Sequence, residues 1–353
     1  MKYDYLVVGA GLYGSTIARL LTDKGKSVLV IEKESNVGGR CYTKNIDGIT
    51  VHVYGAHIFH TSSKEVWDFV NKYCHMKNYV HQVKAYNSHR LYSLPFNMNT
   101  FYEVYGFTTP EQVKHFISKQ YIKNPSTLEE QATSFVGKKM FNLLIKYYTE
   151  KQWNKSCKDL SKDIIKRIPV RYTFNNNYFN DIYQGIPEEG YTKMIENMLD
   201  GIEVKCNVLN YKSYFSKAKK IIYTGKLDEL FDYRLGRLDY RCLNFITEVK
   251  DTDNFQGCPV LNYTDNKHKY TRIIEHKHFL NDVSDKTIIT YEYPSDKGLE
   301  CYPINNEKNN NLHAEYKQLL PENIYIGGRL AEYKYYDMDD IIEKAMKDSI
   351  LYE

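Results

Sequence analysis

The 353-residue sequence lacks several features that would assign it to a common class of protein. Its 48 basic and 44 acidic residues leave a net charge of only +4, which argues against a nucleic-acid-binding surface. No run approaches the ~20 apolar residues of a membrane-spanning helix. Asp4 precedes an apolar run that extends only from Tyr5 to Val8, so the N-terminus does not resemble a signal peptide. We therefore expect a cytoplasmic protein that binds neither nucleic acid nor membranes.

Cysteine chemistry and the common hydrolytic sites are also missing. The seven Cys residues are irregularly spaced and include no Cys-x-x-Cys pair, so we expect reduced thiols and no metal site. The chain has no Ser-His-Asp order and no convincing pair of carboxylates for glycosyl transfer. A length of 353 residues predicts two or three units that share a large core.

The N-terminal segment is predicted to be a strand, a glycine turn, a helix and a second strand. Residues 5–8 form a short apolar run, residues 15–24 fit a helix that Gly25 ends, and residues 27–31 form a second apolar run. These elements follow one another within about 30 residues, which is typical of a βαβ unit with a parallel sheet.

Three glycines in the first turn, Gly9, Gly11 and Gly14, have the spacing of a dinucleotide-binding loop. The first permits a tight turn, the second lets the backbone approach a pyrophosphate, and the third lets the helix pack closely on the strand. The helix N-terminus offers N–H groups and a positive dipole to the phosphates. Glu32 ends the second strand, where a carboxylate accepts from a ribose hydroxyl. The alternative is a glycine turn that holds no ligand.

The middle of the chain changes character twice. Residues 99–165 predict a mostly helical insert, with capping boxes at Thr109–Gln112 and Thr127–Glu130. Residues 240–293 alternate in polarity and are rich in Tyr, Thr, Ile and Val, which predicts antiparallel strands. Two of these strands are expected at residues 270–274 and 287–293.

The last third of the chain is expected to return to the first domain. Short apolar strands are predicted at residues 220–223 and 324–326, followed by an amphipathic helix from about Met338. The polar, Asn-rich residues 305–311 predict a surface loop. The dinucleotide domain is therefore expected to be discontinuous.

The segment Gly38-Gly39-Arg40 follows Glu32 closely and indicates which dinucleotide is bound. This arrangement resembles the glutathione-reductase-type FAD superfamily, in the branch shared with amine oxidases and the Rab GDP-dissociation inhibitors. FAD is therefore expected in preference to NAD. The alternative for the paired glycines is an ordinary loop.

Several longer segments resemble UDP-galactopyranose mutase, in the order of that family and along nearly the whole chain. They are residues 54–60 (YGAHIFH), 94–99 (LPFNMN), 148–153 (YTEKQW), 164–171 (IIKRIPVR), 270–276 (YTRIIEH) and 327–338 (GGRLAEYKYYDM).

The resemblance implies an α/β fold, in which a discontinuous Rossmann-like FAD domain joins a helical domain and an antiparallel β-sheet domain. A homodimer is also implied. The implied boundaries are 1–75, 195–238 and 315–353 for the FAD domain, 96–165 for the helical domain, and 76–95, 166–194 and 239–314 for the sheet domain.

The resemblance also implies a reaction, the interconversion of UDP-galactopyranose and UDP-galactofuranose for cell-surface polysaccharide biosynthesis. In that family N5 of reduced FAD is the nucleophile toward the anomeric carbon, and there is no net redox change. The cofactor therefore carries the chemistry, and the protein positions the sugar nucleotide.

Three residues are implied in catalysis. Arg167 on a mobile loop and Arg272 in the sheet domain would hold the pyrophosphate, and His57 would lie beside the flavin. Each Arg could instead pair with a surface carboxylate, and His57 could be a hydrogen-bonded core residue. The implied substrate contacts are His81, Tyr148, Thr149, Trp153, Arg167, Tyr178, Asn262, Arg272, Tyr302 and Tyr335. The implied FAD contacts are Gly9, Gly11, Tyr13, Gly14, Glu32, Lys33, Gly39, Arg40, His57, Ile58, Arg329, Tyr336, Asp337, Met338 and Ile341.

Trp153 is one of two tryptophans, and the family places it against the uracil ring. Its alternative is core packing, which is also what we expect of Trp67. The segment from Arg329 to Ile341 would place the flavin ring over the N-terminus of the C-terminal helix, where the dipole favours an electron-rich reduced flavin.

Two positions depart from the family pattern. Arg40 stands where the family commonly has Asn, and it is expected to contact the flavin phosphates or ring edge from the same loop. His81 stands near a position where the family tends to have Asn, which leaves that substrate contact in doubt.

Two other classes of protein compete with the mutase. A flavin amine oxidase or desaturase would consume an electron acceptor in proportion to its substrate. A non-catalytic binding protein like the GDP-dissociation inhibitors would purify without colour, and Glu32 and Arg329 would have no ligand.

Overall fold

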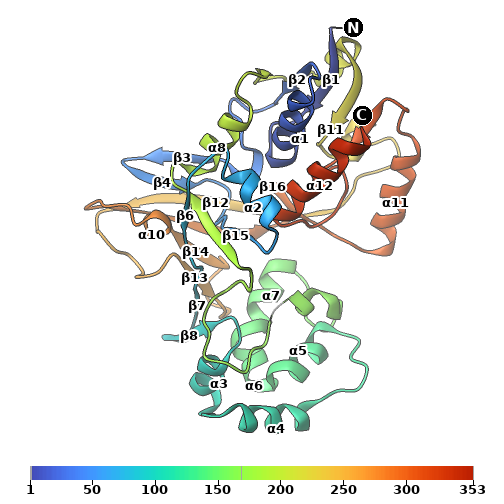
Figure 1. Cartoon of the computed structure of the whole chain (residues 1–353). Helices are drawn as coiled ribbons and strands as arrows, with labels where there is room; N and C mark the ends of the chain where they lie inside the picture. Colours follow the sequence, from blue (N-terminus) through green and yellow to red (C-terminus); the bar gives the residue numbers. More distant parts are fainter. Residues whose placement is uncertain (1, 168, 353) are drawn as a thin grey trace. The chain divides into compact units, whose positions relative to one another are not determined.

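A computed structural model describes residues 2–167 and 169–352, apart from the side chains of Lys166 and Arg167 (Figure 1). The chain folds into two compact units. Unit 1 comprises Met1–Tyr79, Asp181–Tyr240 and Glu300–Glu353, and unit 2 comprises Val80–Asn180 and Arg241–Leu299. The finer division into three domains stays a prediction. No helix among the described residues is both long and apolar enough to cross a membrane.

Unit 1 is built on a parallel sheet whose strands come from distant parts of the chain. Val7 lies opposite Val30 on one side and Ile222 on the other, and Ile222 lies opposite Tyr325. This register confirms that the late strands return to the first domain. The strand order is β10 (Glu203–Lys205), β2 (Val28–Ile31), β1 (Tyr3–Val8), β11 (Ala218–Tyr223) and β17 (Ile324–Ile326).

Helices α1 (Leu12–Asp23) and α12 (Met338–Leu351) pack against each other in unit 1. The end of α1 is as predicted, because Gly25 adopts a φ of +78° and its N–H donates to the carbonyl of Thr22 at 2.9 Å. Its beginning was predicted too late, at residue 15. Gly11 is the N-cap, so the helix starts directly after the glycine turn.

The remainder of unit 1 consists of small sheets and short helices. Trp67 stacks on Tyr183, with ring centroids 5.3 Å apart, and lies near Phe59, but it is only partly buried. The strands form the hairpin β3 (Thr43–Ile46) and β4 (Ile49–His52) and the antiparallel sheet β5 (Phe59–Thr61), β9 (Tyr183–Pro187) and β6 (Met76–Asn78). The helices are α2 (Lys64–Val70), α8 (Gly190–Met198) and α9 (Leu227–Leu230). The strand β16 (Leu299–Pro303) contains the point in the chain where unit 2 ends and unit 1 resumes.

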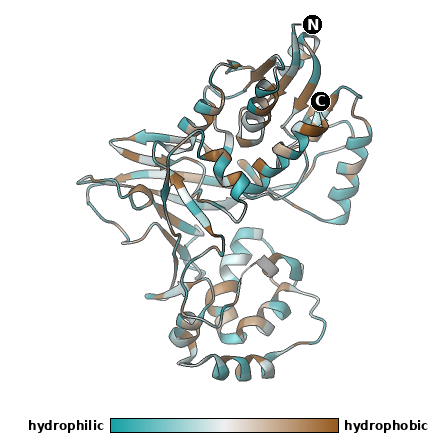
Figure 2. Cartoon of the chain, viewed as in Figure 1, coloured by the Kyte–Doolittle hydropathy of each residue, from teal (hydrophilic) through white to brown (hydrophobic). Residues whose placement is uncertain are grey.

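The surface loop predicted at residues 305–311 is wrong, because α11 (Glu307–Gln318) begins there. The side chain of Asn306 accepts from the backbone N–H of Asn309 at 2.8 Å and caps the helix. Tyr316 anchors the other end, since it is fully buried and stacks on Phe231. The helix is mostly hydrophilic, as its teal colour in Figure 2 shows, so its sequence carries little helical periodicity.

The helical part of unit 2 confirms the predicted insert. Thr109 caps α4 and Thr127 caps α5 in the capping boxes expected from the sequence. A π-helical turn, Phe141–Ile145, precedes the helix that carries several predicted substrate contacts. The helices are α3 (Met98–Tyr105), α4 (Pro110–Gln120), α5 (Leu128–Val136), α6 (Lys138–Met140) and α7 (Lys146–Trp153).

The sheet of unit 2 is antiparallel except where β13 pairs with β7. Asn262, Arg272 and Glu292 lie directly opposite one another on three neighbouring strands, and so share one face. The expected strands at 270–274 and 287–293 are thereby confirmed. The order is β16, β12 (Tyr240–Lys250), β15 (Thr287–Ser295), β14 (Arg272–Glu275), β13 (Val260–Tyr263), β7 (Val83–Asn87) and β8 (Arg90–Leu94). The short helix α10 (Lys277–Leu280) follows β14.

Candidate active site

A cavity of about 340 Å³ lies in unit 1, where β1, β2 and β11 end. The carboxyl ends of parallel strands form the usual ligand crevice of such sheets. Ile58 is buried but does not belong to the lining. All the other predicted FAD contacts line the cavity: Gly9, Gly11, Tyr13, Gly14, Glu32, Lys33, Gly39, Arg40, His57, Arg329, Tyr336, Asp337, Met338 and Ile341.

The glycine turn of this cavity tolerates no side chain at two of its three glycines. Gly9 has a φ of +109°, and a Cβ there would lie 2.1 Å from Oγ1 of Thr224. A Cβ on Gly14 would lie 1.9 Å from the carbonyl oxygen of Gly9. At Gly11 the only atom within 4 Å would be the Cα of Gly39, at 3.8 Å, so the turn is open where a pyrophosphate would approach.

The N-terminus of α1 is suited to an anion. Gly11 provides no side-chain cap, and the first turn contains no acidic residue. The first backbone N–H groups and the positive end of the helix dipole are therefore not matched by a carboxylate of the same turn. This is the arrangement that binds phosphate groups.

Glu32 lies at the end of β2 with little exposure to solvent. Its Oε2 accepts from the N–H of Ala10 at 2.7 Å, and its Oε1 accepts from the N–H of Glu34 at 3.0 Å. An ionised carboxylate has about four lone-pair sites, so acceptor capacity remains for ribose hydroxyls. The fit of a dinucleotide to this part of the lining is good.

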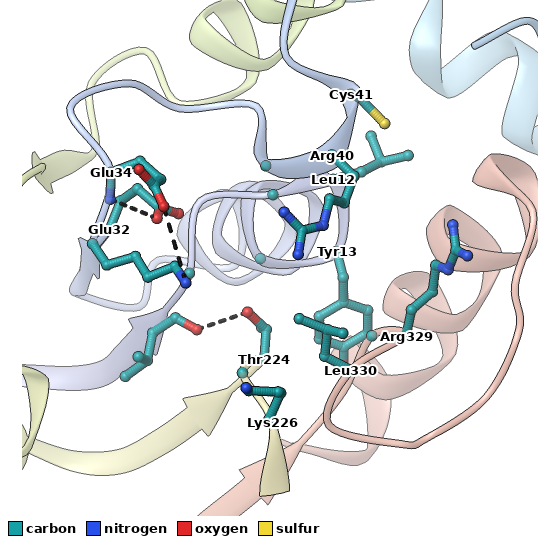
Figure 3. A pocket seen from close by; sticks show the side chains of 18 of the residues that line it. Leu12, Tyr13, Glu32, Glu34, Arg40, Cys41, Thr224, Lys226, Arg329 and Leu330 are labelled. Carbon is teal, nitrogen blue, oxygen red and sulfur yellow. Dashed lines mark hydrogen bonds and ion pairs between the residues drawn. The ribbon is translucent and has the colours of Figure 1, made fainter. Parts of the chain in front are cut away.

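Basic side chains lie at another part of the lining. In the view of Figure 3, Glu32 and Glu34 gather at one end, and Arg40 and Arg329 lie toward the other. The Nη2 of Arg40 donates to the carbonyl of Glu300 at 3.1 Å, and the Nη2 of Arg329 donates to the carbonyl of Cys301 at 2.9 Å. Both guanidinium groups are thus oriented by the backbone of one segment.

His57 lines the cavity as a neutral imidazole. Its Nδ1 lies 2.8 Å from the carbonyl oxygen of Gly55, so Nδ1 carries the proton and Nε2 is an acceptor. Burial, and to a lesser extent the charge of Arg329, lower the pKa of His57 to about 4, although the bond to Gly55 opposes this shift. His57 therefore accepts a hydrogen bond at neutral pH and carries no charge.

The start of α12 is less positive than its dipole alone suggests. Asp339 and Asp340 lie in its first turn, and Asp340 accepts from the N–H of Asp337 at 2.9 Å. These carboxylates already offset part of the positive end of the helix. Arg329, whose guanidinium lies 4.7 Å from the ring centroid of Tyr335, adds a formal positive charge to the lining.

Several lining residues were not predicted from the sequence. Thr224 and Lys226 follow β11, and the Nζ of Lys226 forms an ion pair with Glu300 at 2.7 Å. Tyr54 faces Arg40, whose guanidinium lies 5.8 Å from its ring centroid. Thr224 had a usable signal, because it directly follows a predicted strand of the parallel sheet.

In unit 2, Arg272 is held between a carboxylate and a phenol. Its Nε lies 3.3 Å from Oε1 of the buried Glu292, and its Nη2 donates to the hydroxyl of Tyr148 at 2.6 Å. Burial raises the pKa of Tyr148, so its hydroxyl stays protonated. Asn262 lies beside Arg272 in the register, and its buried Oδ1 has no hydrogen-bond partner among the described residues. A pre-oriented guanidinium next to an unsatisfied amide is a polar site.

Trp153 ends α7 with a partly exposed indole ring. Within residues 2–167 and 169–352 no aromatic ring packs on it, in contrast to Trp67, so one face can accept a base. Thr149, one turn earlier, is buried. Both tryptophans are partly buried, and the contact of Trp153 with a base stays a prediction.

The other predicted substrate contacts have ring contacts of their own, and Tyr178 of unit 2 also interacts electrostatically with Tyr148. His81 is buried, with its ring stacked on Phe179 and edge-on to Tyr178, whose N–H donates to the carbonyl of His81 at 2.7 Å. Tyr302 and Tyr335 stack on each other in unit 1, with centroids 6.0 Å apart. The side chain of Arg167 lies outside the part of the chain that the structure describes, so its contact with the pyrophosphate stays a prediction.

Comparison with known proteins agrees with this geometry. A profile of the UDP-galactopyranose mutase family matches residues 143–335, and a profile of the NAD(P)-binding Rossmann-like domain matches residues 7–73. A dTDP-fucopyranose mutase from Escherichia coli is 36% identical over 98% of this chain and 97% of its own length. A probable UDP-galactopyranose mutase from Klebsiella pneumoniae is 37% identical over 98% of this chain and 93% of its own length.

The fold is shared with a solved structure. The crystal structure of a reduced UDP-galactopyranose mutase superposes with a TM-score of 0.77, at 15% identity, over 99% of this chain and 93% of that chain. The profile match and the two relatives that span nearly the full chain show that it belongs to the UDP-galactopyranose mutase family.

Proposed function

We propose that this protein is an isomerase that interconverts UDP-galactopyranose and UDP-galactofuranose with FAD as its cofactor. One observation carries the proposal: two relatives that each match 98% of the chain are named as mutases of a nucleotide-linked pyranose. The cavity of unit 1 supports FAD, because its glycine turn, its uncapped helix N-terminus and Glu32 fit a dinucleotide.

When bound and reduced, FAD supplies a nucleophilic nitrogen for the anomeric carbon, without net consumption of electrons. The residues of the chain bind and orient. Arg272 neutralises the pyrophosphate through a guanidinium that Glu292 and Tyr148 hold in place. Trp153 stacks on the base, and His57 offers a neutral acceptor nitrogen in the cofactor cavity. Arg167 is proposed as a second cation for the pyrophosphate.

A second substrate has specific support. The relative from Escherichia coli is named as a dTDP-fucopyranose mutase, and it matches the chain as fully as the relative named a probable UDP-galactopyranose mutase. The two nucleotide sugars differ in a methyl group on the base, in the 2′-hydroxyl of the ribose and in the hydroxyl at C6 of the sugar. We also propose a cytoplasmic homodimer, which rests on the family resemblance alone.

The test is an anaerobic turnover assay with protein reduced by dithionite. UDP-galactofuranose and dTDP-fucofuranose are supplied in parallel, and chromatography measures the corresponding pyranoses. Conversion of the first supports the proposal, and faster conversion of the second assigns the chain to the fucose nucleotide. Absence of both conversions with FAD bound contradicts a mutase. Stoichiometric oxygen consumption would indicate the oxidase alternative, and a colourless protein would indicate the non-catalytic one.

A further inference from the structure

Two elements of unit 2 carry half of the predicted substrate contacts. Helix α7 carries Tyr148 and Trp153, and the β13–β14 hairpin carries Asn262 and Arg272. A base and a pyrophosphate of one ligand can be bound together only if these two elements keep a fixed spacing. A misplacement of about 1 Å can cost roughly 100-fold in rate.

Lys151 bridges these two elements. It lies on α7 between Tyr148 and Trp153, and its Nζ donates to three backbone carbonyls of the hairpin. The acceptors are the carbonyl oxygens of Tyr263 at 2.7 Å, His268 at 3.1 Å and Tyr270 at 3.0 Å. An ammonium has three donors, so the hairpin uses all of them.

The acceptors of Lys151 belong to a rigid turn. The rings of Tyr263, His268 and Tyr270 pack on one another, with centroid distances between 4.7 and 5.2 Å. Asp265 accepts from the backbone N–H groups of Lys267 and His268, and it pairs with Nδ1 of His268 at 2.9 Å. The turn therefore keeps its shape by itself, and the ammonium ties α7 to a stable platform.

The carbonyl acceptors of Lys151 lie close in sequence to the predicted substrate contacts of the hairpin. Tyr263 directly follows Asn262, and Tyr270 precedes Arg272 by one intervening residue. Burial lowers the pKa of Lys151 to about 8, although Asp265 opposes this shift. The ammonium has thus been withdrawn from water, and the three carbonyls replace its hydration.

We propose that Lys151 is a positioning residue for nucleotide binding, which holds the base-stacking Trp153 and the phosphate-binding Arg272 at a fixed spacing. The inference rests on the proposed function, since it assumes that both residues bind one nucleotide sugar. Lys151 itself does not need to touch the ligand, because its donors are all used by the hairpin.

A purely structural role would give a different result, and the chain offers a matched control. Lys277 on α10 lies in the same unit and also donates from Nζ to three backbone carbonyls, those of Asp253, Ser284 and Lys286. It is buried, and it connects segments that carry no predicted nucleotide contact. Lys277→Met therefore removes an equivalent set of bonds without changing the spacing of α7 and the hairpin.

The experiment compares Lys151→Met, Lys151→Arg and Lys277→Met with the unmodified holoenzyme. Titration of UDP gives its Kd, and steady-state turnover of UDP-galactofuranose gives KM and kcat. Lys151→Met is expected to raise Kd and KM about tenfold with kcat within about twofold, because the contacts remain but their spacing is lost. Lys151→Arg, which keeps charged donors, should recover part of the affinity. Lys277→Met should leave Kd and KM within about twofold.

Two outcomes would overturn the inference alone. One is a Lys151→Met enzyme with unchanged Kd and KM. The other is a Lys277→Met enzyme whose KM rises as much, since the effect would then be general loosening of unit 2. Should Lys151→Met not fold, as judged by circular dichroism and flavin content, Lys151→Gln carries the same test with fewer donors. An unmodified enzyme that neither binds UDP nor isomerises the sugar would overturn the proposed function, and the inference with it.

Discussion

The cofactor cavity of unit 1 and the Arg272 group of unit 2 are built from different kinds of contact. In unit 1, missing side chains and backbone N–H groups shape the turn at Gly9, Gly11 and Gly14. In unit 2, one side chain from a neighbouring strand and one from a helix orient the guanidinium of Arg272. The first kind of site depends on close backbone approach, and the second on paired charges and hydrogen bonds.

Because of this difference, substitutions in the two sites are expected to impair ligand binding and turnover in different ways. A site formed by backbone atoms is lost when a side chain is added at a close contact, because the turn and the helix are already in van der Waals contact there. A site made by side chains loses a defined part of its binding or rate when one group is removed. Substitutions in each site can distinguish complete loss of a ligand from partial loss of binding or rate.

Gly14→Ala is expected to abolish FAD binding, and with it turnover, because the new Cβ would lie 1.9 Å from the carbonyl oxygen of Gly9. Flavin absorbance of the purified protein measures this loss. UDP should still bind to the apoprotein, because Trp153 and Arg272 lie in unit 2. Loss of both ligands would show that the two units fail together.

Gly25→Ala, just after the C-terminal end of the same helix, is the control substitution. Its φ is +78°, but a Cβ would meet no atom within 4 Å, so only backbone strain of about 1 kcal/mol is expected. The variant should keep its yellow colour with a slightly lower Tm.

Arg272→Ala is expected to lower kcat at least about 100-fold, because the charge that develops on the departing pyrophosphate loses its partner. The flavin spectrum should persist, since the FAD cavity lies in unit 1. Arg272→Lys should fall between the two enzymes, as it keeps the charge and loses the planar fork that contacts Glu292 and Tyr148. If FAD is lost instead, Arg272 has a structural role.

Trp153→Ala is expected to raise KM roughly 10- to 100-fold through loss of base stacking, which contributes about 1–3 kcal/mol. Trp67→Phe is the matched control, because Trp67 already stacks on Tyr183 inside unit 1. That variant should lower Tm and leave KM unchanged. Equal KM values for the Trp153→Ala and unmodified enzymes would assign Trp153 to packing.

His57 predicts a modest pH effect in unit 1. Its pKa is about 4 in the folded protein and about 6.5 in an unfolded chain, so between these values the unfolded chain binds a proton that the folded one excludes. The free energy of unfolding should therefore fall as pH drops through this window, by at most about 3 kcal/mol. Urea unfolding at pH 7 and pH 5 measures this change. His57→Gln should lower the pH sensitivity, and an unchanged difference would exclude His57 as its source.

Elements that depend on contacts between residues close in sequence could be predicted, and elements that depend on distant residues could not. The βαβ unit, the end of α1 at Gly25 and the capping boxes of α4 and α5 depend on neighbours within a few residues, and the sequence alone predicts them. The beginning of α1 was misplaced because Gly11 caps the helix without a side-chain signal. Helix α11 was missed because Tyr316, which stabilises it against Phe231, lies beyond the polar segment that was interpreted as a loop.

The candidate sites show the same limit. Long motifs identified the residues of the FAD cavity, but not Lys226 and Glu300, whose ion pair joins segments that are distant in sequence. Sequence reasoning alone could not find that Glu292 orients Arg272 or that Lys151 spans to the hairpin, because both depend on strand register.

The glycine turn could be predicted from the sequence alone, because the positive φ of Gly9 and the close contact of Gly14 with the carbonyl of Gly9 are local properties of the backbone. The motifs of the sequence also determined the family. Only the tertiary structure decided which charges are paired, which tryptophan is left unstacked and which lysine connects α7 to the sheet. The physical reason is that hydrogen bonds and ion pairs act over about 3 Å, and only folding brings distant residues that close.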